Sequence, residues 1–243
     1  MVVCILAVLV IGAVAVGFLA YYGTSYFNWN FNQATTDFSF EEEVGTTNET
    51  VTLDVNVAAG SFSVVFVDNE SLLYEIEMQV QNSTLATEGV PTVSFISNTI
   101  AVEYPSAGMN ITLGSGVNYT LNIHTQSGSV SVVFSAGAHI GDVTASVTSG
   151  SINIVMTDDT VLLGSPTFDL ETSTGGISII AGLPSGVGGS IDCDTSLGSI
   201  SVTAPGWTET FSDHYETTDY DTASQTLTIV AETSLGSISA VLT

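Results

Sequence analysis

The chain has 243 residues, of which 25 are Asp or Glu and none is Lys or Arg, so its formal net charge at pH 7 is −25. This composition excludes nucleic-acid binding, because proteins neutralise phosphate groups with Lys and Arg. It also excludes Lys–carboxylate and Arg–carboxylate salt bridges, so the carboxylates repel one another unless bound cations, high salt or a low pH relieves them. We expect an acidic protein adapted to one of these conditions.

The chain begins with an apolar segment, Val2–Ala20, which as a helix would span about 29 Å, close to the thickness of a bilayer core. An aromatic-rich stretch, Tyr21–Phe31, follows and is typical of a membrane interface. We predict a hydrophobic α-helix over residues 1–23, a linker over 24–39 and an extracellular β-repeat domain over 40–243. The helix either anchors the chain in a membrane or packs with its copies in the core of a filament.

The bare apolar start resembles the N-terminal helix of archaeal type IV pilins, which is exposed once a basic leader has been removed. The resemblance covers only this first segment, and it implies a filament in which such helices pack together. Gly12, Ala13 and Gly17 are the candidate packing residues, because small side chains let two helices approach closely.

A short phrase recurs through the rest of the chain. "TSLGSISV" (Thr195–Val202) returns as "TSLGSISA" (Thr233–Ala240), with the relatives "TQSGSVSV", "VTSGSINI" and "TSTGGISI". Each phrase joins two strands of alternating apolar and polar residues through a glycine. We predict that glycine supplies a turn with positive φ at each of these positions. The predicted repeat turns are Gly60, Gly128, Gly150, Gly175, Gly198 and Gly236.

Repeats of this length predict strands that stack on one another and bury a shared apolar face, which would include Ile177 and Ile200. The predicted fold class is mainly β: a β-solenoid or stacked β-repeat ectodomain preceded by one N-terminal hydrophobic α-helix. The longest interval between phrases holds "PGWTETFSDHYETTDYD". It predicts a loop or lateral insertion in which Trp207 caps the stack.

From residue 40 onward the chain resembles the adhesin and auto-transporter "head" β-repeat domains of microbial surfaces. The resemblance is carried by "AGSFSVVF" (Ala59–Phe66) and by the serial "TxSGSIxI" units. It implies a β-solenoid at the cell surface and no established catalytic residues.

The two cysteines, Cys4 and Cys193, lie far apart in dissimilar segments, so we expect no disulfide between them. Cys193 alternates with Asp192 and Asp194 and is predicted to face the core. A group of acidic residues is a candidate Ca²⁺ site, with a solvated acidic loop as the alternative. Its members are Asp213, Glu216, Asp219 and Asp221, with Asp192 and Asp194 as further oxygen donors. We expect no other cofactor.

Asn-x-Ser/Thr sequences precede the regular repeats, and behind a membrane-type segment they predict an exported glycoprotein. The predicted glycosylation sites are Asn48, Asn69, Asn82, Asn110 and Asn118.

Catalytic groups are scattered in the sequence. Of His124, His139 and His214, only His214 has an acidic neighbour, Asp213, and no Lys or Arg is available to hold an anionic substrate. We therefore predict a protein that is not an enzyme, rather than a secreted or anchored hydrolase.

The predicted function is that of an extracellular structural protein, a pilus-like filament subunit at the cell surface. Its N-terminal helices would pack in the core and its glycosylated β-repeat heads would form the outer surface. The alternative is a singly anchored surface adhesin that does not polymerise. The expected partners are further copies of the chain, the membrane through residues 2–20, and cell-surface glycans or neighbouring surface proteins.

Overall fold

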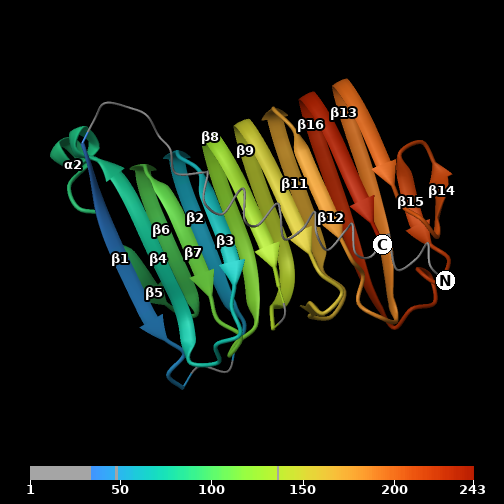
Figure 1. The fold of residues 1–243 in the computed structure, drawn as a ribbon, viewed down its shortest axis with the longest axis horizontal. Helices are drawn as coiled ribbons and strands as arrows, with labels where there is room; N and C mark the ends of the chain where they lie inside the picture. Colours follow the sequence, from blue (N-terminus) through green and yellow to red (C-terminus); the bar gives the residue numbers. More distant parts are fainter. Residues whose placement is uncertain (1–33, 47–48, 136) are drawn as a thin grey trace, which may run out of the picture. The chain divides into compact units, whose positions relative to one another are not determined.

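β-Strands make up most of the structure, a computed structural model that describes residues 34–46, 49–135 and 137–243. The strands form one 16-stranded sheet (Figure 1). The strands are β1 (Thr35–Glu43), β2 (Val51–Ala59), β3 (Phe62–Phe66), β4 (Leu72–Gln81), β5 (Val93–Ile96), β6 (Thr99–Ser106), β7 (Gly108–Leu113), β8 (Tyr119–Phe134), β9 (His139–Met156), β10 (Val161–Leu162), β11 (Thr167–Thr174), β12 (Ile177–Ala181), β13 (Val187–Thr203), β14 (Trp207–Phe211), β15 (His214–Thr217) and β16 (Gln225–Leu242). In the described part of the chain the one helix is α2 (Asn82–Glu88). The prediction of a mainly β fold is confirmed.

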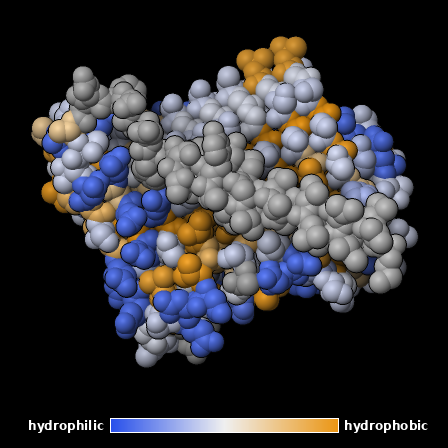
Figure 2. All heavy atoms as spheres, viewed as in Figure 1, coloured by the Kyte–Doolittle hydropathy of each residue, from blue (hydrophilic) through white to orange (hydrophobic). Residues whose placement is uncertain are grey.

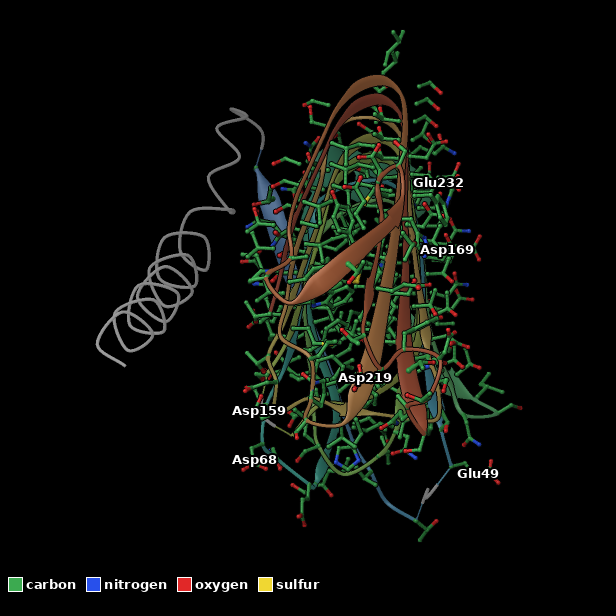
Figure 3. The ribbon with its side chains drawn as sticks, turned by 90° about the vertical axis from the view of Figure 1, so that its right-hand side faces the viewer. Glu49, Asp68, Asp159, Asp169, Asp219 and Glu232 are labelled. Carbon is green, nitrogen blue, oxygen red and sulfur yellow. The ribbon has the colours of Figure 1, made fainter. Side chains whose placement is uncertain are left out.

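The repeated unit is a rung with a first arm, a bend and a second arm. In β8 the arms lie on either side of Gly128, and the buried positions change from odd to even numbers across this bend. The strands β9, β13 and β16 are rungs of the same kind, whereas β2–β3, β6–β7 and β11–β12 each build a rung from two strands. Viewed along the stack, the first arms and the second arms form two walls that enclose the core side chains (Figure 3).

The parallel register places equivalent apolar side chains in columns between the walls. Val130 lies opposite Ile152, and Ile152 lies opposite Ile177. The column continues through Ile238 to Ile200. Val130, Ile152 and Ile177 are at most 2% exposed. Because burying one such side chain is worth about 1.5–3 kcal/mol, these columns are the main source of stability. The predicted inner face of the repeats is confirmed for Ile177, while Ile200 is only partly buried.

Aromatic side chains fill the end of the core that lies away from the bends. The ring of Phe134 lies 5.5 Å from that of Phe66 and 5.4 Å from that of Phe168, and Tyr119 meets Phe66 edge-on at 5.6 Å. The Tyr119 hydroxyl donates a hydrogen bond of 2.7 Å to the carbonyl oxygen of Leu73. Burial raises the pKa of Tyr119 above its ordinary value, so this donor stays protonated.

The rungs are not stacked in the order of the sequence. The last strand, β16, lies between the β11–β12 rung and β13. Similarly, β2–β3 lies between β6–β7 and β8. The stacked β-repeat expected from the sequence is present, but a simple solenoid, in which each unit lies on the unit before it, is not. The reason is that the chain leaves the stack after β13, forms β14 and β15, and returns to a position inside the stack.

Antiparallel strands are added at both ends of the stack, to both walls at one end and to one wall at the other. At one end β5 pairs with β6 in the first-arm wall, while β4 and then β1 extend the second-arm wall. At the other end the hairpin β14–β15 extends only the first-arm wall beyond β13. Trp207 of this hairpin packs on Gly189, where an added Cβ would come within 2.4 Å of the indole ring. The expected insertion with Trp207 as a cap is therefore observed for the first-arm wall.

The β domain begins earlier than residue 40. β1 starts at Thr35, inside the predicted linker, because Phe38 and Phe40 alternate with polar residues and pack against the core. The predicted hydrophobic helix, together with its small packing residues, lies outside the described residues. Among the residues that are described, no helix has the length and apolar character needed to cross a membrane.

Candidate binding surfaces

The glycines of the repeat phrase form one column across the bends. A Cβ on Gly150 would lie 1.5 Å from the carbonyl oxygen of Gly128, and a Cβ on Gly198 would lie 1.5 Å from that of Gly236. These four glycines lie inside continuous strands rather than in turns, and Gly198 does not have a positive φ. The predicted positive φ is confirmed at Gly60, Gly128, Gly150, Gly175 and Gly236 and is wrong for Gly198. The requirement that all six share is the close approach of a neighbouring backbone carbonyl, which the sequence pattern did not indicate.

The threonine of the phrase has a role that the sequence pattern did not indicate. The Thr172 hydroxyl donates to the carbonyl oxygen of Gly150 (3.3 Å), and the Thr233 hydroxyl donates to that of Gly175 (3.2 Å). Thr195 makes the same contact with the next rung. Each threonine lies three residues before a column glycine and binds the glycine carbonyl of the adjacent rung. The repeated Thr-x-x-Gly spacing thus links neighbouring bends.

Carboxylates gather on the outer face of the first-arm wall. Glu171 lies opposite Glu232, and Glu232 lies opposite Asp194, with strands about 4.8 Å apart. Asp169 and Asp192 occupy the adjacent row of the same face. In Figure 3, Asp169 and Glu232 project outward from one wall. Like charges directly opposite one another are destabilising, so this column favours bound cations or a cationic partner. Further carboxylates on this face are Asp54, Glu103 and Asp142.

The outer face of the second-arm wall carries no charge across β3, β7, β8, β9, β12, β16 and β13. It presents one row of Ser and Asn and one row of mainly Val and Ile, and these side chains are half-buried or exposed. Figure 2 looks onto this wall and shows hydrophobic residues exposed between hydrophilic ones. The two rows are Asn110, Ser63, Ser131, Asn153, Ser178, Ser239 and Ser201, and Thr112, Val65, Val133, Val155, Ile180, Val241 and Thr203.

The carboxylates of the candidate Ca²⁺ site lie on the hairpin, on the loop after it and on β13. Asp213 lies between β14 and β15, Glu216 lies in β15, Asp219 and Asp221 follow β15, and Asp192 and Asp194 lie in β13. Among the residues that the structure describes, no three His, Cys, Asp or Glu side chains gather closely enough to hold a metal ion. The predicted ligands are thus not brought together, because β15 separates the two turns that carry most of them.

His214 is paired, but not with its sequence neighbour. Its Nε2 lies 3.0 Å from a carboxylate oxygen of Glu216, and its Nδ1 lies 3.9 Å from one of Asp192. The imidazole also stacks on Phe211 at 4.3 Å. The pairing follows from the hairpin, because β15 lies antiparallel to β13 and places His214 opposite Asp192. The contacts with Glu216 and Phe211 lie within the hairpin, and the one with Asp192 reaches β13.

Cys193 faces the core as predicted, with 4% of its surface exposed. Burial, with the nearby carboxylates of Asp192 and Asp213, raises the pKa of its thiol to about 12. The thiol is therefore neutral and unreactive at neutral pH.

The described glycosylation candidates differ in accessibility. Asn69 and Asn82 are exposed, whereas Asn110 and Asn118 are half-buried, and Asn48 lies outside the described residues. The Asn69 side-chain oxygen accepts hydrogen bonds from the backbone N–H (3.1 Å) and hydroxyl (2.9 Å) of Ser71 in its own sequon. Glycosylation remains a prediction, and the exposed asparagines are its first candidates.

No protein-family model matches the sequence, and no curated protein matches it. Among solved structures, the chain is similar to a candidate cell adhesion protein from Clostridium sporogenes, with a TM-score of 0.68 and 13% sequence identity. The match covers 86% of this chain and 100% of that chain. At this identity the likeness establishes a shared fold.

Two further matches are weaker. A candidate adhesin from Bacteroides fragilis has a TM-score of 0.31 and 11% identity, covering 85% of this chain and 97% of that chain. A candidate adhesin from Parabacteroides merdae has a TM-score of 0.27 and 9% identity, covering 87% and 97% of the two chains. These scores are too low to support a structural argument.

Proposed function

We propose that this protein is a non-enzymatic, extracellular surface protein of the adhesin type, in which the stack of rungs presents flat faces to other surface molecules. The observation that carries the proposal is the division of charge between two extended walls: the first-arm wall is lined with carboxylates, and the second-arm wall is uncharged from β7 to β13. The fold shared with a candidate cell adhesion protein over 86% of the chain supports it.

The two walls suit different partners. The acidic wall attracts cationic groups or divalent ions such as Ca²⁺, since the chain has no Lys or Arg to neutralise it. The hydroxyl and amide groups of the uncharged wall suit cell-surface glycans or neighbouring proteins, which bind through hydrogen bonds and apolar contacts. Glycans on Asn69 and Asn82 would lie on exposed surface beside these walls.

The filament role is the finer form of this proposal. It rests on the apolar segment Val2–Ala20, whose packing in a filament core would free the chain from the membrane. Electron microscopy of material shed without detergent tests it, because helical fibres support a filament and dispersed particles support a single anchor.

Expression of the full chain in a non-adherent bacterial host tests the surface role. We expect intact cells to be labelled by an antibody to the β domain and to attach to immobilised cell-surface glycans. Surface exposure should be checked by shaving with a glutamyl protease, because trypsin finds no Lys or Arg at which to cleave.

Replacing Glu171, Glu232 and Asp194 by their amides should weaken attachment that depends on Ca²⁺. Labelling only after cell lysis, or attachment no greater than that of the host, would contradict the proposal.

A further inference from the structure

The second arm of β13 is an unprotected sheet edge. Ser199–Thr203 pairs with β16 on one side, and no strand among the described residues pairs with its other side. Ile200 and Val202 are only partly buried, whereas Ile238 and Ala240, opposite them in β16, are each 1% exposed. The hairpin β14–β15 covers the first arm of β13 and leaves this second arm open.

Features that normally block edge pairing are missing at this edge. The segment 195–206 contains no charged residue, although the chain carries 25 carboxylates. Next to the edge, Leu197 and Leu235 lie opposite each other and are 68% and 48% exposed. Natural proteins protect edges with charges, Pro, bulges or a covering element, and Ser199–Thr203 has none of these among the described residues. This uncharged edge, with exposed apolar residues beside it, is a site for an added strand.

Among the described residues, no strand pairs with the outer side of β1, which is the other edge of the second-arm wall. This edge carries Asp37, Glu41, Glu42 and Glu43, and the pairing of β1 with β4 is interrupted between Glu42 and Glu43. If two copies paired through their β1 edges, the carboxylates of one copy would face those of the other. β1 runs in the same direction as β13, since β1 is antiparallel to β4 and β4 is antiparallel to β7.

The ends of the stack are stepped in opposite walls. The hairpin β14–β15 overhangs β13 in the first-arm wall, while β1 overhangs β5 in the second-arm wall. Two β13 ends facing each other would bring hairpin against hairpin. A β13 end facing a β1 end instead places β1 beside β13 and opposite β15. Because the hairpin adds two strands and β1 extends only one strand beyond β5, β14 of one copy then meets β5 of the next, and the copies join at an angle.

We infer that the free edge of the β13 second arm binds the β1 edge of a second copy, head to tail, and continues the second-arm wall from one molecule into the next. Phe38 and Phe40 of β1 lie on the core side and would cover Ile200 and Val202. On the outer side, the hydroxyls of Ser199, Ser201 and Thr203 face outward as donors for the carboxylates of β1, which no Lys or Arg of the chain can neutralise.

This contact joins different surfaces of the two copies, so it is heterologous and gives open chains of molecules rather than closed dimers. It uses only the β domain and does not depend on the adhesin-type role. Failure of the cell-attachment experiment would leave it intact, and loss of the contact would not remove the surface role of a single molecule.

Crosslinking of the full chain in detergent micelles tests the pairing. In a Cys4→Ser background, with the buried Cys193 left in place, Ser39→Cys and Ser201→Cys proteins are mixed in equal amounts and treated with a short bis-maleimide. We expect dimers from the mixture at about tenfold or more the yield of either protein alone. Dimers from Ser201→Cys alone would show that two β13 edges meet, and no dimers from the mixture would show that the edges do not meet; either result overturns the inference.

Charge variants provide an independent readout of association, measured by sedimentation velocity. Ser201→Asp should weaken association about tenfold or more, because it sets a carboxylate against the acidic β1 edge. Ser201→Lys should strengthen association about threefold or more in a head-to-tail contact, whereas it would weaken a contact between two β13 edges.

Ser178→Asp is the matched control, since Ser178 lies in the same outer row but in the interior of the wall. It should leave association unchanged. Equal losses from Ser178→Asp and Ser201→Asp would show that copies stack through the face of the wall, and this would overturn the edge-to-edge inference.

Discussion

At the scale of single residues, the recurring phrase is explained by contacts between rungs. Gly150 and its equivalents let adjacent backbones approach more closely than any side chain permits, and threonines such as Thr172 bind the carbonyl groups at these bends. The alternating Ile and Val residues then face one core. The glycine, the threonine and the inward-facing apolar residues of the phrase thus have separate physical roles, which can be tested one at a time.

Gly150→Ala should destabilise the protein by about 3 kcal/mol, because the new methyl group overlaps the Gly128 carbonyl oxygen at a position that also has a φ of 150°. Thermal unfolding should show a melting temperature lower by roughly 6–12 °C. The control is Gly164→Ala, since Gly164 has a φ of 65° but no atom within 4 Å of an added Cβ. Gly164→Ala should lower the free energy of unfolding by only about 1–2 kcal/mol. Equal losses in the two variants would mean that backbone conformation, not close approach, selects the glycine.

Thr172→Val should cost about 1 kcal/mol in the free energy of unfolding, because it keeps the shape of the side chain and removes the donor to Gly150. Denaturant titration measures the change. The chain provides a natural comparison at Val147, which occupies the equivalent position of β9. Val147→Thr should lower the free energy of unfolding by less than about 1 kcal/mol, since the new hydroxyl would lie beside the Gly128 carbonyl and could donate to it. A silent Thr172→Val variant would show that the hydrogen bond does not stabilise the bend.

At the scale of the elements, charge is arranged by strand pairing. The register that aligns the core columns also aligns Glu171, Glu232 and Asp194 on the outside, although they are far apart in the sequence. Since the chain contains no Lys or Arg, this column is relieved only by cations from solution. The same pairing leaves one uncharged edge, at β13, and one acidic edge, at β1.

Glu232→Gln should stabilise the protein at low salt by about 0.5–1 kcal/mol, because it removes the carboxylate in the middle of the column. The melting temperature should rise by roughly 2–4 °C, and the gain should disappear near 1 M NaCl, where charges are screened within about 3 Å. The matched control is Glu103→Gln on the same wall, since Glu103 lies opposite the neutral Asn56. A gain that does not change with salt, or an equal gain in the control, would rule out the repulsion.

At the scale of the whole molecule, the order of the rungs determines how the protein holds together. β16 contacts both β11–β12 and β13, so the end of the chain lies inside the stack. β13 and its hairpin cap are connected to the rest of the stack through β16. The strand that is last in the sequence, β16, therefore lies inside the stack, and the stack ends at β13 and its hairpin.

Removing residues 225–243 tests this arrangement. We expect the truncated chain to lose cooperative unfolding and to expose apolar surface, because β13 and the β11–β12 rung lose the strand between them. Circular dichroism during heating and binding of a hydrophobic dye measure the two effects. A stack in sequence order would instead lose only its last rung. A truncated protein that still melts cooperatively would therefore contradict the observed order.

The sequence by itself determined the mainly β class, the inward face of the repeats, the core position of Cys193 and the capping tryptophan. These features depend on local alternation, which a few neighbouring residues specify. The glycine positions were also evident, but their reason was not, because the close contact at Gly150 is made with another rung.

Only the tertiary structure decided the order of the rungs, the carboxylate column, the partners of His214 and the open edge of β13. The physical reason is that near-identical phrases such as those at Thr195 and Thr233 have the same pattern of apolar and polar residues. Nothing in that pattern determines which phrase pairs with which neighbour. The pairing is decided by the packing of all rungs together, and the outer charges follow from it.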